Sequence, residues 1–301
     1  MTAPLRSDAR KETVVEKLEG KVAVVTGAGS GIGRAVATHL AEARMRVVVA
    51  DIEQGAMDAT VAQLTGAGHE AIGVQTDVSD GESVQALADA AVARFGAVHL
   101  IHNNAGVGVG GPIWAHTESD WRWVLGVNLW GVIHGIRVFV PLMIEQGEPA
   151  HVVNTASMAG LISVPHLGAY NVSKHGVVTL SETLHRDLQL QGARIGVSVL
   201  CPGLVMTNIF ESQRNRPEGL SGETGAGNLS ALIRTAADDA TADALGAFGD
   251  VLSPDEVGAS VLDAVRTDRF YVLTHPEITR VLVRARYDDI VETRSPTALR
   301  P

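Results

Sequence analysis

The residues with the clearest potential for chemistry are a tyrosine and a lysine four positions apart, Tyr170 and Lys174. Both fall in a stretch with a helical pattern, so their side chains share one face of the helix. A free tyrosine has a pKa of about 10, and a nearby ammonium group lowers that pKa by favouring the phenolate. The pair can therefore supply a general acid/base that works near neutral pH. Y-x-x-x-K alone is common by chance, so the pair needs support from other residues.

That support comes from Ser157, which lies 13 positions before the tyrosine. Ser157 follows an apolar run, His151–Ala156, that is predicted to be a strand. Its hydroxyl is then expected at the carboxyl edge of a sheet, where doubly wound folds bind ligands. A simple turn residue is the structural alternative for a lone serine, and it loses weight once Tyr170 and Lys174 stand beside it.

A glycine-rich loop follows the first predicted strand and precedes a helical pattern. Its sequence is Thr26-Gly27-Ala28-Gly29-Ser30-Gly31-Ile32-Gly33, which fits T-G-x-x-x-G-x-G and does not fit G-x-G-x-x-G. Glycines permit a tight turn and let backbone N–H groups approach a pyrophosphate, and the following helix N-terminus adds a favourable dipole. With a strand before it and a helix after it, the loop predicts a dinucleotide site.

An acidic residue, Asp51, ends the second predicted strand. A carboxylate about 20 positions beyond such glycines accepts hydrogen bonds from the adenosine ribose hydroxyls, and it repels a 2′-phosphate. Neither Ser30 nor Ile52, the positions from which a cation could meet that phosphate, is Arg or Lys. The sequence therefore predicts NAD rather than NADP. A helix N-cap is the structural alternative for Asp51.

With these motifs in order, the chain resembles the main branch of the short-chain dehydrogenase/reductase family. The resemblance runs from about residue 20 to residue 207 and returns weakly over 254–275. It implies hydride transfer between a nicotinamide and a carbonyl or secondary alcohol, with the cofactor carrying the redox chemistry. Further segments that carry it are Asp77-Val78, Asn103-Asn104-Ala105-Gly106, Val127-Asn128-Leu129, and Pro202-Gly203 with Thr207 beyond.

The resemblance implies a role for each site residue. Ser157 would polarise the substrate oxygen and Tyr170 would transfer the proton. Lys174 would bind the nicotinamide ribose and depress the tyrosine pKa, and Asn128 would fix a water in a proton relay to Lys174. The residues implied in cofactor binding are Gly27, Ser30, Gly31, Ile32, Gly33, Asp51, Asp77, Val78, Asn104, Ala105, Gly106, Tyr170, Lys174, Pro202, Gly203, Val205 and Thr207.

Alternating strand and helix patterns position these residues. They predict a doubly wound, Rossmann-like α/β fold, with a parallel sheet of about seven strands and helices on both faces. The strands are expected at Lys21–Thr26, Arg46–Asp51, Ala71–Thr76, Val98–His102, His151–Ala156, Ile195–Cys201 and Phe270–Thr274. Helices are expected at 32–44, 55–66, 81–95, 117–146, 169–191, 254–267 and 276–292.

One catalytic domain is expected over 20–292, with an N-terminal extension at 1–19 and a C-terminal tail at 293–301. Within the domain, 208–253 is too long for an ordinary loop and follows a strand's carboxyl end. We interpret it as a substrate lid, with a surface insertion as the alternative. Residues expected to border the substrate are mostly apolar, which favours a hydrophobic alcohol or ketone: Val107, Met158, Val164, His166, Leu204, Ile209 and Phe210.

Composition limits the partners. The net charge is -10 and no basic stripe is present, which argues against nucleic acid and against an anionic membrane surface. No apolar run approaches the roughly 20 residues that span a bilayer. The single cysteine, Cys201, and the absence of a signal-peptide pattern favour a cytoplasmic protein. No histidine pattern indicates a metal site.

Assembly and alternative functions complete the expectations. In the resembled family the helices corresponding to 117–146 and 169–191 pair across subunits, and these helices carry Trp130, Ile133, Val177 and Leu184, so a homotetramer is expected, with a dimer as fallback. A non-catalytic dinucleotide-sensing regulator is the main alternative function. A sugar-nucleotide epimerase is less favoured, because such enzymes usually have T-G-x-x-G-x-x-G and a larger C-terminal domain.

Overall fold

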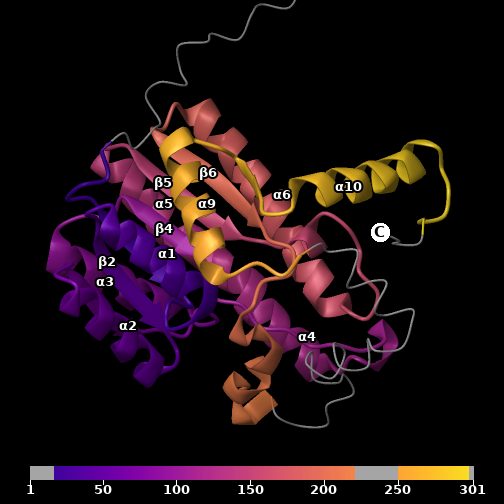
Figure 1. Cartoon of the computed structure of the whole chain (residues 1–301), viewed down its shortest axis with the longest axis horizontal. Coiled ribbons are helices and arrows are strands. Elements are labelled where there is room, and N and C mark those ends of the chain that lie inside the picture. Colours follow the sequence, from indigo (N-terminus) through magenta and orange to yellow (C-terminus); the bar gives the residue numbers. More distant parts are fainter. Residues whose placement is uncertain (1–16, 221–249, 298–301) are drawn as a thin grey trace, which may run out of the picture.

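The computed structural model describes residues 17–220 and 250–297. Its centre is one parallel sheet of seven strands in the order β3-β2-β1-β4-β5-β6-β7 (Figure 1), which confirms the predicted doubly wound fold. The strands are β1 (Val22–Thr26), β2 (Arg46–Asp51), β3 (Ala71–Gln75), β4 (Leu100–Asn103), β5 (Ala150–Thr155), β6 (Ile195–Cys201) and β7 (Tyr271–Leu273).

Helices cover both faces of the sheet. α1, α2 and α9 pack on one face, and α3, α5 and α6 pack on the other. α4 and α10 lie toward the carboxyl edge and the periphery (Figure 1). The helices are α1 (Gly31–Glu42), α2 (Gln54–Gly66), α3 (Gly81–Phe95), α4 (Glu118–Leu125), α5 (Gly131–Gln146), α6 (Gly168–Gln191), α9 (Pro254–Thr267) and α10 (Pro276–Val291).

The central strands are apolar at nearly every position because each face of the sheet is buried under helices. In β1, Ala23 and Val25 pack into the cluster that includes α1 and α9. Val22 and Val24, which alternate with them, pack into the opposite cluster with α3 and α5. All five residues of β1 are buried, so the strand has no polar face.

The direction of winding reverses between β1 and β4, which are neighbours in the sheet. Such a switch point opens a crevice at the carboxyl ends of the strands. The glycine loop leaves β1 there, and the segment starting at Asn104 leaves β4 there. The fold thus brings two of the predicted cofactor motifs to one edge of the sheet.

The helix expected at 117–146 is interrupted. α4 ends at Leu125, a π-helical turn spans Gly126–Trp130, and α5 begins at Gly131. π turns are rare and often occur at functional sites. By length and composition, Glu118–Gln146 is apolar enough to cross a membrane. In this fold, apolar residues of the segment pack in the protein core, as Phe139 and Met143 of α5 show.

The segment expected to be a lid begins with two 3₁₀ helices, η5 (Asn208–Asn215) and η6 (Glu218–Leu220). The rest of the predicted lid up to residue 249, and residues 1–16 of the N-terminal extension, lie outside the described residues. The lid and the domain boundaries therefore remain predictions.

Candidate active site

The backbone of the glycine loop allows α1 to pack closely against it. Gly27 and Gly31 have φ angles of 62° and 53°, a region that glycine enters without strain. A Cβ on Gly33 would lie 2.2 Å from the Gly27 carbonyl oxygen, so α1 can pack against the loop only with glycine there. Ser30 begins α1 without a side-chain cap bond, and the first turn contains no acidic residue. The helix N-terminus therefore fits a pyrophosphate.

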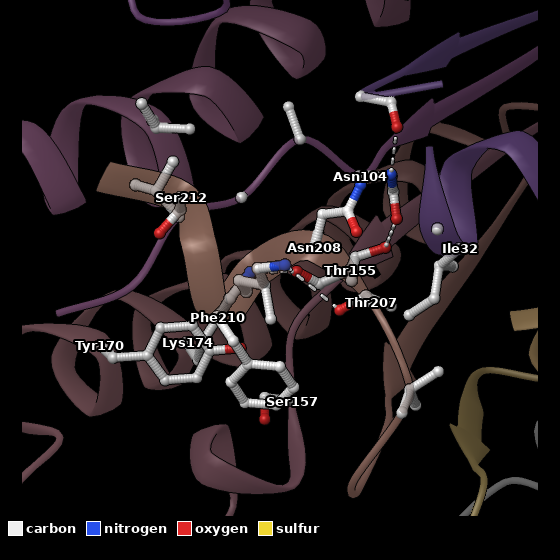
Figure 2. Close-up of a pocket in the computed structure, with 18 of the residues that line it drawn as sticks. Ile32, Asn104, Thr155, Ser157, Tyr170, Lys174, Thr207, Asn208, Phe210 and Ser212 are labelled. Atoms are coloured by element: carbon white, nitrogen blue, oxygen red, sulfur yellow. Dashed lines mark hydrogen bonds between the residues drawn. The ribbon is translucent and has the colours of Figure 1, made fainter. Parts of the chain in front are cut away.

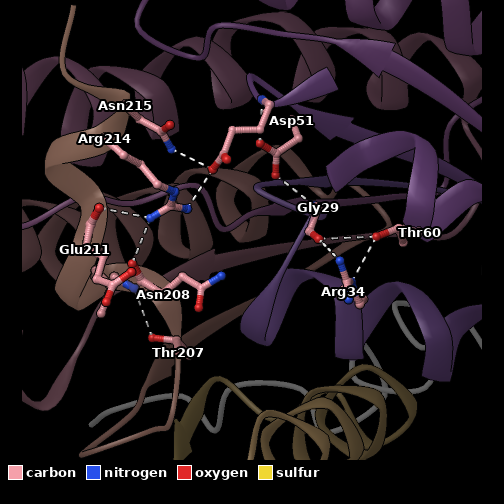
Figure 3. Close-up of polar contacts among 11 residues, drawn as sticks. Gly29, Arg34, Asp51, Thr60, Thr207, Asn208, Glu211, Arg214 and Asn215 are labelled. Atoms are coloured by element: carbon pink, nitrogen blue, oxygen red, sulfur yellow. Dashed lines mark hydrogen bonds and ion pairs between the residues drawn. The ribbon is translucent and has the colours of Figure 1, made fainter. Parts of the chain in front are cut away.

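Asp51 fixes the loop on its other side. Its Oδ2 accepts a hydrogen bond from the Gly29 backbone N–H (2.7 Å), and its Oδ1 accepts one from the Glu53 N–H (3.0 Å). The N-cap of α2 is Glu53, so the N-cap alternative for Asp51 is wrong. Arg34 supports the same loop through the Gly29 carbonyl and the Thr60 hydroxyl (Figure 3).

Three of the four predicted catalytic side chains, Ser157, Tyr170 and Lys174, line one cleft (Figure 2), whereas Asn128 does not line it. Tyr170 and Lys174 lie on the first two turns of α6, and Ser157 follows β5. Lys174 Nζ donates to the Thr155 carbonyl oxygen (2.8 Å) and lies 5.6 Å from the centre of the Tyr170 ring. The Ser157 hydroxyl is hydrogen-bonded to Tyr170 and accepts the Ala159 N–H (3.1 Å). A proton donor, a second hydroxyl and an ammonium group thus converge.

Burial controls the charges of this group. Desolvation lowers the pKa of Lys174 from 10.5 to about 8. Desolvation raises the pKa of Tyr170, and the hydrogen bond from Ser157 only partly opposes it. The pKa of Tyr170 is therefore above its usual value in the protein alone, and its depression by Lys174 stays a prediction. Tyr170 is neutral at pH 7 and is ready to act as an acid.

Asn128 lies on the π turn and is completely buried. Its Oδ1 accepts the Val107 N–H (2.8 Å), and its Nδ2 donates to the Val107 carbonyl (2.9 Å) and to the Ser173 hydroxyl (3.2 Å). Both amide hydrogens are therefore engaged in holding the chain after β4. The side chain thus supports this segment, and the water relay expected at Asn128 stays a prediction.

The cleft has a volume of about 460 Å³ and joins the cofactor and substrate halves of the site. All the expected cofactor residues line it except Gly33, which acts through packing. Of the expected substrate residues, Met158 does not line the cleft; it is buried, with its sulfur 3.6 Å from the Thr279 hydroxyl. The others line it: Val107, Val164, His166, Leu204, Ile209 and Phe210.

Several lining residues escaped the sequence analysis. Trp123, one of four tryptophans in the chain, is buried and lines the cleft. The Ser212 hydroxyl accepts the Gly108 N–H (3.1 Å) and donates to the Gly108 carbonyl (3.2 Å). Arg214 and Asn215 contact Glu53 from 161 and 162 positions away, so an arginine lines the cleft although Ser30 and Ile52 are not basic. No local pattern could have indicated these contacts.

No three His, Cys, Asp or Glu side chains within 17–220 and 250–297 are grouped to hold a metal ion.

Comparison with known families decides the identity of this site. A family model described as short chain dehydrogenase matches residues 21–218. The chain belongs to this family. It is accordingly an oxidoreductase acting on CH–OH groups, as its dehydrogenase relatives are. The matched range contains Tyr170, Lys174, Ser157 and the glycine loop, so the motifs found in the sequence are those of the family.

Individual relatives support the assignment. The chain is 36% identical over 275 residues to 1-deoxy-11-beta-hydroxypentalenate dehydrogenase of Streptomyces exfoliatus, covering 91% of this chain and 89% of the relative. It is 33% identical over 285 residues to C alpha-dehydrogenase of a Sphingobium species, covering 94% and 89%. A short-chain dehydrogenase/reductase from Burkholderia phymatum, solved in complex with NAD, is 49% identical, with a TM-score of 0.86 and coverage of 93% of this chain and 98% of that chain.

Proposed function

We propose that this short-chain dehydrogenase uses NAD to interconvert a hydrophobic secondary alcohol and its ketone. The observation that carries the proposal is the convergence of Tyr170, Ser157 and Lys174 on a cleft whose other half contains the glycine loop and Asp51. Asp51 would bind the adenosine ribose, and Pro202, Gly203 and Thr207 line the same cleft. The related Burkholderia structure with NAD supports this choice of cofactor.

The protein's contribution is positioning and proton transfer. When bound, the nicotinamide supplies or accepts the hydride. In the direction of ketone reduction, neutral Tyr170 donates its proton to the substrate oxygen, while the Ser157 hydroxyl holds that oxygen in place. The Lys174 ammonium group then stabilises the phenolate that remains. Alcohol oxidation is the reverse sequence.

The substrate class follows from the lining of the cleft. The lining includes five apolar or aromatic residues, Trp123, Val164, Leu204, Ile209 and Phe210, beside the polar His166 and Ser212. Among the described residues, Lys174 and Arg214 are the only Lys or Arg that line the cleft, and Arg214 is paired with Glu53. An apolar ligand gains from burial there, whereas a carboxylate would lack a fixed partner.

A non-catalytic dinucleotide sensor is the second candidate on the same scaffold, and the complete set of Ser157, Tyr170 and Lys174 disfavours it. The test is an assay of the wild-type enzyme with 1-phenylethanol, cyclohexanol and 2-octanol, each with NAD and with NADP. We expect reduction of the cofactor, with kcat/KM at least tenfold higher for NAD because Asp51 repels the 2′-phosphate. Binding of NADH without turnover of any alcohol would favour the sensor. Equal use of NAD and NADP would contradict the role of Asp51.

We also propose a homotetramer working in the cytoplasm. The proposed interface differs from the one expected from the sequence, because Val177 and Leu184 are buried within the subunit and cannot contribute to it. Trp130 of the π turn and Val172 of α6 are each about half exposed and provide apolar surface on the pairing helices. Cytoplasmic location agrees with Cys201, the only cysteine, which is buried and reduced.

Light scattering at micromolar concentration should give four times the 31.6 kDa mass of one chain. Trp130→Glu should lower the measured mass because it places a charge in the apolar contact, while Trp114→Glu, at an exposed tryptophan outside these helices, should not. A monomeric mass for the wild type would refute the proposal.

A further inference from the structure

One arginine stands at the adenosine end of the cleft. Among the described residues, Arg214 and Lys174 are the only Arg or Lys side chains that line the cleft. Lys174 belongs to the catalytic group, whereas Arg214 lies on η5 (Figure 3). Arg214 contacts Glu53, which starts α2 just beyond Asp51. The cation that NADP-binding sites use for the 2′-phosphate is thus present in this chain, although NAD is the proposed cofactor.

Glu53 forms an ion pair with Arg214. Arg214 Nη2 donates to Glu53 Oε1 (2.6 Å), and Asn215 Nδ2 donates to the same oxygen (2.8 Å). The hydrogen bond from Arg214, followed by that from Asn215, lowers the pKa of Glu53, so the carboxylate is ionised at neutral pH. Both side chains of the ion pair remain about one-third exposed, at 36% and 34%, and an incoming ligand can compete for them.

The ion pair lies next to the proposed ribose site. The Glu53 N–H donates to Asp51 Oδ1 (3.0 Å), so the backbone of Glu53 touches the carboxylate expected to bind the ribose. The guanidinium is then only one glutamate side chain away from that carboxylate. Arg214 Nη1 also donates to the carbonyls of Asn208 and Glu211 (3.1 Å each), which would keep the guanidinium in this region if Glu53 released it.

We propose that Glu53 is a second determinant of cofactor choice, which excludes NADP by holding Arg214 in an ion pair. The inference rests on the proposed dinucleotide site. A 2′-phosphate carries up to two negative charges and prefers the fork of donors that a guanidinium offers. In the wild type that fork is neutralised, and Glu53 adds a second carboxylate to that of Asp51. Removing the charge of Glu53 frees Arg214 to receive the phosphate.

The position of η5 does not depend on Glu53. Arg216 forms an ion pair with Asp120 of α4 (2.6 Å), and the two side chains are only 3% and 0% exposed. Ser212 is anchored to both backbone groups of Gly108. These buried contacts hold the segment without any contribution from Glu53. The substitution Glu53→Gln keeps an acceptor oxygen. We therefore expect it to remove the negative charge while η5 stays in place.

The test compares two mononucleotide probes that differ only in the 2′-phosphate, 5′-AMP and adenosine 2′,5′-bisphosphate. Their dissociation constants are measured by calorimetry, so no turnover is required. For Glu53→Gln we expect the ratio of the two constants, bisphosphate over 5′-AMP, to fall about tenfold, the size of one charge-assisted hydrogen bond. The double variant Glu53→Gln/Arg214→Met should lose this gain, because the cation is gone.

Glu277→Gln is the matched control, since it removes one carboxylate from an exposed ion pair with Arg280 on α10, outside the cleft. It should leave the ratio unchanged. An unchanged ratio in Glu53→Gln, or a gain that survives Arg214→Met, would overturn the proposal. If the wild type failed to bind 5′-AMP at all, the dinucleotide site itself would be contradicted and this inference would fall with it. If the wild type binds 5′-AMP and Glu53→Gln leaves the ratio of dissociation constants unchanged, only the role of Glu53 is rejected and the dinucleotide site stands.

Discussion

Replacing Tyr170 with phenylalanine is expected to lower kcat by about a thousandfold, which is within the range that a positioned general acid contributes. The substitution removes only the hydroxyl that donates the proton, and the partly buried ring stays in place beside Ser157 and Lys174. The dissociation constant for NADH, measured by fluorescence, should change by less than about threefold. The combination of lost turnover and retained binding is what a proton donor predicts.

Tyr287→Phe is the matched control, because it deletes a tyrosine hydroxyl from the exposed side of α10. Its kcat should equal that of the wild type. If Tyr170→Phe kept a tenth of the wild-type kcat, Tyr170 would not be the proton donor.

Replacing Lys174 with methionine is expected to lower kcat/KM for ketone reduction by at least about a hundredfold, because the cation that stabilises the tyrosine phenolate is lost. The same residue predicts a pH dependence. Burial brings the pKa of Lys174 to about 8, so the ammonium group loses its proton as the pH rises through 8. Reduction needs the charged form, and kcat/KM should therefore fall above pH 8.

Lys174→Arg separates this charge effect from a general loss of structure, since arginine stays charged throughout the range. Circular dichroism should confirm that the variant is folded, and its remaining activity should show no decline near pH 8. Tyr170 does not account for such a decline, because burial raises its pKa above the usual value. A wild-type profile that is flat from pH 7 to about 9.5 would remove Lys174 from the mechanism.

Much of this site could be predicted from the sequence because its positions are set by local patterns. Strands such as β2 (Arg46–Asp51) and β6 (Ile195–Cys201) are mostly apolar, and their observed bounds are those expected. Strand ends and helix starts then fix which motif reaches the carboxyl edge of the sheet. Asp51, Ser157 and Tyr170 arrive at one cleft for this reason.

The features of the site that the sequence did not predict depend on packing between segments far apart in the chain. The rise in the pKa of Tyr170 comes from burial, which the four-residue spacing to Lys174 does not reveal. Leu184 was expected at a subunit interface, but its side chain packs in the hydrophobic core of the subunit itself. The ion pair between Glu53 and Arg214 joins residues 161 positions apart, so neither sequence neighbourhood indicates the other.

The most direct test of the central claim is to follow the carbinol hydrogen itself. The wild-type enzyme is incubated with NAD and 1-phenylethanol, cyclohexanol or 2-octanol carrying deuterium on the carbinol carbon, and the reduced cofactor is examined by mass spectrometry. A dehydrogenase built around Tyr170, Ser157 and Lys174 predicts one deuterium in NADH for every ketone formed, with none in the Tyr170→Phe variant beyond its residual turnover. NADH that forms without the label, or bound NAD that is never reduced by any of the three alcohols, would contradict the account.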